Sequence, residues 1–285
     1  MVSIKIMLLN KPNLYFVLGG LGKQIAFTSI IENIYKQTKN KLCIASGFYP
    51  IFKHHPKVAK QFLYENSFLT ETSHHHYKKY NNIIHRDPYN SNFLKGDMHL
   101  IDSFAELYGV KEYVKEPDLY INKQLEKKLK PEIIKLNKFI IVQFHGGEGN
   151  IESNRGYDYG QEVVNTLKNK YPFMNILNYR LEHQPKLIGC LDMPNESYET
   201  FMIYAKYCYT FISIDSSLMH ICSNRHFNKK GICIFGISSP KMFGYKKNIN
   251  LRSNYPDSNE IDPKLIIENV EKTFDNLNGK DNENV

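Results

Sequence analysis

Residues 209–240 restrict the fold more than any other part of the chain. Two apolar runs in this stretch, 209–214 and 231–235, are rich in aromatic and β-branched residues. Each run ends in a polar, small-residue loop, at 215–217 and at 236–240, and the first loop opens a short helical pattern of apolar positions. Strand, loop and helix in this order are typical of a parallel α/β sheet, whose carboxyl edge binds ligands.

The first of these loops carries candidate ligand-binding residues. A strand followed by a helix with free amides can hold a phosphate. A carboxylate repels phosphate, so Asp215 is expected to cap the helix or to hold His220 and a ribose hydroxyl, while Ser216 and Ser217 offer hydroxyls and amides to the anion. The alternative interpretation is that Asp215, Ser216 and Ser217 only cap the helix and that His220 is a histidine of the core. Together with the loop at 236–239, the pattern favours a nucleotide site.

Length and composition limit the class of protein. A chain of 285 residues with 42% hydrophobic content suits one large α/β domain or two domains of ordinary size. Without a long apolar run or a cleavage site at the start, we expect no integral membrane association and a cytoplasmic protein. The cysteines form no CxxC pair, which indicates reduced thiols and no structural zinc; they are Cys43, Cys190, Cys208, Cys222 and Cys233.

The net charge of +8 favours an anionic partner such as a nucleotide, a nucleic acid or an acidic lipid surface. The lysines are spread along the chain, so the charge does not choose among these partners.

The chain contains two successive βα series. The first begins with a strand at 14–18, a glycine loop at 19–22 and a helix at 23–35, and continues with a strand at 41–45 and a helix at 98–108. Between this second strand and the helix at 98–108 lies the polar, histidine-rich segment 54–92. It shows no clear hydrophobic period and is expected to be irregular and solvent-facing.

The second series follows a charged stretch at 116–138, which is the candidate boundary between domains. It comprises predicted strands and helices at 139–144, 159–171, 175–179 and 198–206. Two series predict two similar α/β domains, residues 1–135 and 136–285. The polar tail from Asn276 is expected to fray.

The glycine loop and the block ISIDSSLMH…IFGISSP resemble glycosyltransferase family 9, the heptosyltransferase-like enzymes, over most of the chain. In that family the block reads roughly as a strand, Asp, Ser or Thr, Gly, two residues and His, then a strand ending Phe-Gly and a Pro-containing loop. The matching residues here are Asp215, Ser216, Ser217, His220, Phe235, Gly236 and Pro240. Ser217 departs from the family pattern, since glycine is usual there.

The resemblance implies a GT-B fold, in which two Rossmann-like domains face each other across a cleft. Residues 1–135 would bind the acceptor and residues 136–285 the nucleotide-sugar. Arg155 is the candidate cation for the donor diphosphate, although a surface arginine is an equally good interpretation. The implied donor-binding residues are Ser153, Arg155, Ser216, Ser217, His220, Gly236 and Ser238.

The first glycine loop departs from the family at its most important position. The family reads Gly-Asp there, with the Asp as general base, whereas this chain reads Gly22-Lys23. A protonated lysine cannot accept a proton, but it can hold an anionic acceptor or the leaving diphosphate. The base would then be Asp97, Asp102, Asp87 or a histidine of segment 54–92. The predicted catalytic residues are Lys23, Asp97 and Asp215, and the predicted acceptor-binding residues are Gly20, Gly22, Lys23 and His54.

No metal site or cofactor is expected, because the nucleotide-sugar is a substrate and enzymes of this type rely on amides and a basic side chain. Neighbouring histidines of one loop point in different directions, which disfavours a metal site. The histidines concerned are His54, His55, His74, His75, His76 and His85.

The sequence therefore predicts a glycosyltransferase, inverting and metal-independent, acting on a glycan or lipid-linked saccharide. The alternatives are a bacteriophage-type DNA glycosyltransferase acting on a hydroxymethylated base, a catalytically inactive nucleotide-binding remnant, and an epimerase of the same architecture. The expected setting is the cytoplasm of a bacterial or phage-infected cell. The sugar, the nucleobase and the oligomeric state stay open.

Overall fold

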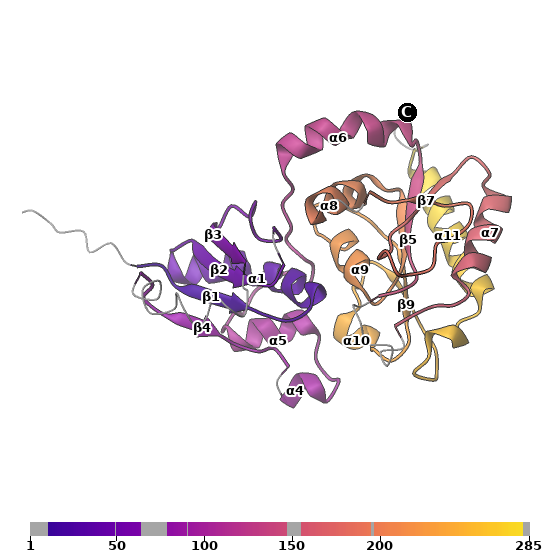
Figure 1. Ribbon diagram of the computed structural model, residues 1–285. Coiled ribbons are helices and arrows are strands. Elements are labelled where there is room, and N and C mark those ends of the chain that lie inside the picture. Colours follow the sequence, from indigo (N-terminus) through magenta and orange to yellow (C-terminus); the bar gives the residue numbers. More distant parts are fainter. Residues whose placement is uncertain are drawn as a thin grey trace, which may run out of the picture.

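The computed structural model describes residues 11–48, 50–63, 79–89, 91–146, 155–194 and 197–281. They form two parallel sheets, each covered by helices (Figure 1). We call residues 11–107, around the first sheet, the first lobe, and residues 139–281, around the second, the second lobe. The α/β class expected from the sequence is confirmed.

The first sheet has the strand order β3-β2-β1-β4. Its strands are β1 (Leu14–Val17), β2 (Leu42–Ser46), β3 (Val58–Leu63) and β4 (Ile83–His85), and its helices are α1 (Leu21–Thr38), α4 (Ser91–Leu94) and α5 (Leu100–Leu107). The expectation of an irregular segment at 54–92 is wrong for its described residues, because β3 and β4 flank the central pair of strands. Both are partly exposed edge strands, so their sequences lack a continuous apolar run.

The second sheet has the order β10-β9-β8-β5-β6-β7. Numbered within the lobe, this is the 3-2-1-4-5-6 order of doubly wound nucleotide-binding sheets, which reverses between β5 and β8. Its strands are β5 (Phe139–Gln143), β6 (Asn175–Asn178), β7 (Leu191–Asp192), β8 (Thr210–Ile214), β9 (Ile232–Phe235) and β10 (Ile249–Arg252). Ligands in such sheets bind outside the carboxyl ends at the point of reversal.

Helices cover both faces of the second sheet (Figure 1). They are α7 (Gly160–Lys170), α8 (Tyr198–Tyr207), α9 (Ser217–Cys222), α10 (Pro240–Phe243), the 3₁₀ turn η1 (Ser258–Glu260) and α11 (Pro263–Asp281). The expectation of a frayed tail from Asn276 is wrong up to Asp281, where α11 ends, and residues 282–285 lie outside the described residues.

One apolar core runs through both lobes. Phe27 of α1 and Phe104 of α5 belong to the same buried cluster as Phe201 of α8 and Met219 of α9. Helices α8 and α9 lie on the side of the second sheet that faces the first lobe, whereas α7 and α11 cover the other side (Figure 1). The lobes are therefore joined by buried apolar surface as well as by the chain.

Residues 108–122, the crossing segment, lead from the first lobe to α6 (Lys123–Lys135), which lies at the top of Figure 1 and packs against α8 of the second lobe. The lysines of α6 lie on its exposed face, while Glu126 and Ile133 are buried. Glu126 pairs with Lys206 of α8, which ties α6 to the second lobe. Within the described residues, no helix is long and apolar enough to cross a membrane.

Candidate functional site

A cavity of about 340 Å³ lies between the two lobes, at the carboxyl ends of both sheets. The first lobe contributes the beginning of α1, with Gly20, Gly22 and Lys23, and the ring of Tyr89. The second lobe contributes residues at or just after the ends of β5 and β8, the strands at which the sheet order reverses. They include Gln143, Gly146, Asp215, Ser216, Ser217 and His220.

The glycine loop sets up the beginning of α1 at the cavity. Gly19 has a φ of 96°, which favours glycine, and its carbonyl oxygen accepts a hydrogen bond from Gln24 Nε2 at 2.9 Å. The N-cap is Gly20, which has no side chain to cap the helix. The first amides of this 18-residue helix therefore lie at the cavity wall without a side-chain cap.

Lys23 is only 9% exposed, although it is charged. Its Nζ lies 2.9 Å from Asp87 Oδ1 and 4.3 Å from the centre of the Tyr89 ring. Lys23 lies on the helix that follows β1, and Asp87 lies in the loop that follows β4. The pair therefore joins the two segments that leave these neighbouring strands of the first sheet. Burial raises the pKa of Asp87, but hydrogen bonds from the Tyr89 amide and from Lys23 outweigh it and lower the pKa overall. A carboxylate therefore stands beside Lys23.

On the opposite wall, β8 ends at Ile214 and Ser216 is the N-cap of α9. The amide of Leu218 donates to Gln143 Oε1 at 3.2 Å, so one of the amides expected to hold phosphate is already satisfied. Asp215 is buried, and this burial raises its pKa against the opposing effects of Ser238 and Arg155.

His220 is a neutral hydrogen-bond donor at the cavity. Its Nδ1 lies 2.7 Å from the hydroxyl of Tyr245, and burial lowers the pKa of His220 to about 3. Burial also keeps the Tyr245 phenol protonated by raising its pKa, and His220 is its partner among the described residues. The phenol therefore donates to Nδ1, which places the ring proton on Nε2.

The Nε2 side of His220 faces the first lobe. A Cβ atom built on Gly22 would lie 2.7 Å from both Nε2 and Cδ2 of the ring. On the other side, Nε2 lies 3.9 Å from Asp215 Oδ1. Gly22 and His220 thus mark a close approach of the two lobes, which only glycine permits at position 22.

Arg155 lines the main cavity and a small adjoining pocket with Gly236 and Ser238. Gly236 has a structural reason of its own, since a Cβ there would lie 2.7 Å from the backbone nitrogen of Ser258. The structure thus brings Arg155 and Gly236 beside the Asp215 loop. Ser153, the other predicted donor-binding residue of this loop, lies outside the described residues.

Two predicted site residues make other contacts. Asp97 is 73% exposed at its side chain and pairs with Lys241 at 2.9 Å, beside a groove on α5. His54 pairs with Glu199 of α8. Neither is among the described residues that line the main cavity. Their roles stay predictions, without support from the geometry.

The remaining candidates for a base or a metal ligand are dispersed. Asp102 accepts a hydrogen bond from Tyr113 at 2.6 Å and pairs with Lys115, and His55 contacts Asp118. His74, His75 and His76 lie outside the described residues. Within the described part of the chain, no three His, Cys, Asp or Glu side chains gather as a metal site would require.

Sequence reasoning missed most of the aromatic lining. The cavity also contacts Phe48, Tyr89, Tyr179, Tyr198 and Phe243. Gln143 and Tyr179 could have been found, because they stand at the ends of two predicted strands. The others come from loops and helix ends whose sequences carry no comparable signal.

No protein-family model matches this sequence, and no curated protein matches it. Solved structures do match. A family 9 glycosyl transferase from Veillonella parvula has a TM-score of 0.69 at 14% identity, covering 93% of this chain and 97% of that one. E. coli ADP-heptose lipopolysaccharide heptosyltransferase II has a TM-score of 0.71 at 12% identity, covering 92% and 98%.

The E. coli heptosyltransferase WaaC, solved with ADP, has a TM-score of 0.65 at 11% identity, covering 92% of this chain and 99% of that one. These likenesses cover more than nine tenths of this chain and so extend over both lobes. The chain has the GT-B fold of these family 9 glycosyltransferases, as the resemblance implied.

Proposed function

We propose that the protein is a glycosyltransferase that moves a sugar from a nucleotide-sugar to an acceptor hydroxyl. One observation carries the proposal: the cavity lies at the carboxyl ends of both parallel sheets and receives Lys23 from one lobe and Arg155 from the other. A two-substrate transfer requires such a site, with each lobe holding one reactant. The likeness to solved glycosyltransferases supports this assignment.

The second lobe would bind the donor. Arg155 and the hydroxyls of Ser216 and Ser217, which line the cavity, would contact the diphosphate, and the Nε2 proton of His220 would add a neutral donor. The small pocket at Gly236 and Ser238 would lie near the nucleoside. Arg155 and these donors would offset the charge that develops on the departing diphosphate, so the proposed reaction needs no bound metal.

The first lobe would bind the acceptor, which we propose to be a glycan or lipid-linked saccharide. In the geometry, Asp87 is a better candidate for the base than Asp97. Neither is among the described residues that line the main cavity, but Asp87 pairs with Lys23, which does line it, whereas Asp97 pairs with Lys241. Asp87 would take the proton of the acceptor hydroxyl as its oxygen bonds to the anomeric carbon. The bond from that carbon to the diphosphate breaks, its electrons leave with the diphosphate, and the configuration inverts.

The first test is a thermal-shift and hydrolysis screen of nucleotides and nucleotide-sugars, repeated with a saccharide acceptor and with duplex DNA carrying hydroxymethylated bases. Stabilisation by one nucleotide-sugar, with consumption only in the presence of saccharide, is the expected result. Consumption only with the modified DNA would replace the proposed acceptor. Binding without turnover would identify an inactive protein.

Matched carboxylate variants then test the base. Asp87→Asn is expected to lower kcat by about 10²-fold or more, the usual contribution of a general base, with little change in donor affinity. Asp97→Asn is the control and should retain activity, because Asp97 pairs with Lys241 outside the cavity. The reverse result would return the role to Asp97.

A further inference from the structure

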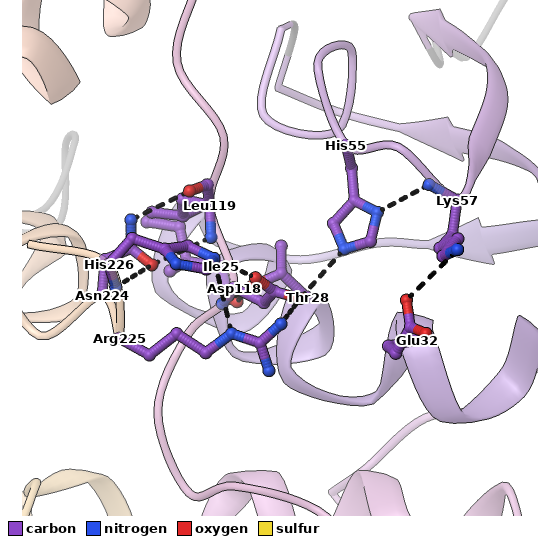
Figure 2. A network of polar contacts seen from close by, with 10 residues as sticks. All are labelled: Ile25, Thr28, Glu32, His55, Lys57, Asp118, Leu119, Asn224, Arg225 and His226. Atoms are coloured by element: carbon purple, nitrogen blue, oxygen red, sulfur yellow. Dashed lines mark hydrogen bonds and ion pairs between the residues drawn. The ribbon is translucent and has the colours of Figure 1, made fainter.

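The crossing segment contains a buried carboxylate that contacts both lobes. Asp118 is 1% exposed, and both of its oxygens accept hydrogen bonds. His226 Nε2 donates to Oδ1 at 2.7 Å, and His55 Nε2 lies 3.2 Å from Oδ2, which Arg225 also contacts (Figure 2). His55 belongs to the first lobe, whereas Arg225 and His226 belong to the second.

Backbone bonds reinforce this contact. The Asp118 amide donates to Thr28 Oγ1 of α1 at 2.8 Å. Leu119 and Asn224 exchange two hydrogen bonds, from the Leu119 amide to Oδ1 at 3.0 Å and from Nδ2 to the Leu119 carbonyl at 2.9 Å (Figure 2). The Arg225 amide donates to the Pro117 carbonyl at 3.0 Å. Residues 117–119 are thus bound along residues 224–226 as well as to α1.

The proton positions follow from the partners. The Lys57 amide donates to His55 Nδ1 at 3.1 Å, so the ring proton of His55 is on Nε2 and points to Asp118. Arg225 is the permanent cation among the groups that face the carboxylate in the described chain. Burial raises the pKa of Asp118, but the hydrogen bond and charge of its partners lower it overall, so the carboxylate is ionised at neutral pH.

Both elements held by Asp118 also carry residues of the cavity. Thr28 lies five residues after Lys23 on α1, a distance of about 7.5 Å along the helix axis. Asn224, Arg225 and His226 come just after Ser223, the C-cap of α9, and α9 carries His220. Helices α1 and α9 pack against each other, and both begin at the cavity. A change in the contacts of Asp118 therefore acts on the spacing between Lys23 and His220.

We propose that Asp118 is a positioning residue, an interlobe clasp that holds α1 and α9 at the spacing the cavity requires. Its role in catalysis rests on the proposed function, whereas its role in lobe spacing does not. The clasp is distinct from the apolar interface because it is polar, directional and located on the segment that connects the lobes.

Hydrogen–deuterium exchange of the full-length protein tests the clasp directly. The amides of Asp118, Leu119 and Arg225 all donate across it. Asp118→Asn preserves the side-chain volume, but its N–H₂ group would face the N–H donors that now bind the carboxylate. Because the clasp loses these hydrogen bonds, amide exchange at 117–119 and 224–226 should become about tenfold faster or more. The matched control is Asp102→Asn, because the partners of Asp102 are Tyr113 and Lys115 of the crossing segment and neither belongs to the second lobe.

A second pair of variants keeps the test decisive if Asp118→Asn folds poorly. Arg225→Lys retains the charge and should preserve slow exchange, whereas Arg225→Met should accelerate it at the same two segments. Unchanged exchange in both Asp118→Asn and Arg225→Met would overturn the proposal. So would an equal acceleration at β5 and α7, because that pattern indicates general destabilisation rather than loss of a local clasp.

Activity supplies the readout specific to positioning. With ADP as the probe, Asp118→Asn should bind within about twofold of the unmodified protein, since the donor residues of the second lobe stay in place, while kcat of transfer falls about tenfold or more. A loss of ADP affinity with unchanged kcat would contradict a positioning role. If another nucleotide of the thermal-shift screen binds in place of ADP, that nucleotide becomes the probe. If the unmodified protein binds no nucleotide of the screen, the proposed function fails, and the exchange experiment still decides the clasp.

Discussion

The proton on His220 is determined by a residue 25 positions later in the chain. Tyr245 donates its phenol proton to Nδ1, so the imidazole presents an N–H at Nε2 to the cavity. The pattern Asp-Ser-Ser followed by His predicted this histidine as a donor-binding residue. The sequence contained nothing that paired it with Tyr245, because the two come together only when α9 packs beside the turn after α10.

Tyr245→Phe removes that donor while preserving the ring. We expect the free energy of unfolding to fall by about 1 kcal/mol, and the imidazole proton to distribute between both nitrogens, because Nδ1 loses its partner. Nitrogen-15 NMR of the labelled imidazole measures the tautomer, with His183, an exposed histidine, as an internal reference. A single Nε2-protonated form in the variant would show that another group determines the tautomer.

At the scale of elements, the beginning of α1 is adapted to its neighbour in the other lobe. Gly20 and Gly22 look equivalent in the sequence, but the space around them differs. A Cβ on Gly20 would meet no atom within 4 Å, whereas one on Gly22 would lie 2.7 Å from the His220 ring. Helix propensity alone would favour alanine at position 22, so the packing between lobes explains the glycine.

Gly22→Ala is therefore expected to destabilise the protein by about 1 to 3 kcal/mol through overpacking. Gly20→Ala is the matched control and should cost at most about 1 kcal/mol, the difference between glycine and alanine at an N-cap. Urea unfolding measures both. The clash should largely disappear when Gly22→Ala is combined with His220→Ala, and additive effects in this double-mutant cycle would contradict the contact.

The elements differ in how well their sequences reveal them. The buried strands β5, β8 and β9 are continuous apolar runs and were predicted nearly to the residue. By contrast, β3 and β4 carry polar residues because they are partly exposed edge strands, and no local pattern identified them. Short edge strands are decided by pairing with a neighbour, which is a property of the sheet.

At the scale of the whole molecule, buried neutral histidines couple stability to pH. Burial lowers the pKa of His99 to about 4, as it lowers that of His220 to about 3, against 6.5 in the unfolded chain. At a pH between the folded-state and the unfolded-state pKa values, the unfolded chain binds more protons than the folded protein. Their contribution to stability is therefore fully present above about pH 6.5 and is lost as the pH falls toward the folded-state pKa values.

We expect the free energy of unfolding to drop between pH 7 and pH 5 by about 1 to 2 kcal/mol for each of these histidines. His99→Gln should reduce that drop, whereas His183→Gln, which replaces an exposed histidine, should leave it unchanged. Urea unfolding at the two pH values provides the measurement. An equal drop in the unmodified protein and in His99→Gln would exclude His99 as a source.

The sequence by itself determined the α/β units and the loops that form the site, because strand periodicity, helix caps and glycine positions act over a few residues. Tertiary structure alone decided which side chains from distant segments meet, such as Lys23 with Asp87 and Asp118 with Arg225. Pairs like these lie 64 and 107 residues apart, so no local pattern records them. Lys23 meets Asp87 because the neighbouring parallel strands β1 and β4 bring their carboxyl ends side by side, and Asp118 meets Arg225 because the crossing segment packs between the lobes.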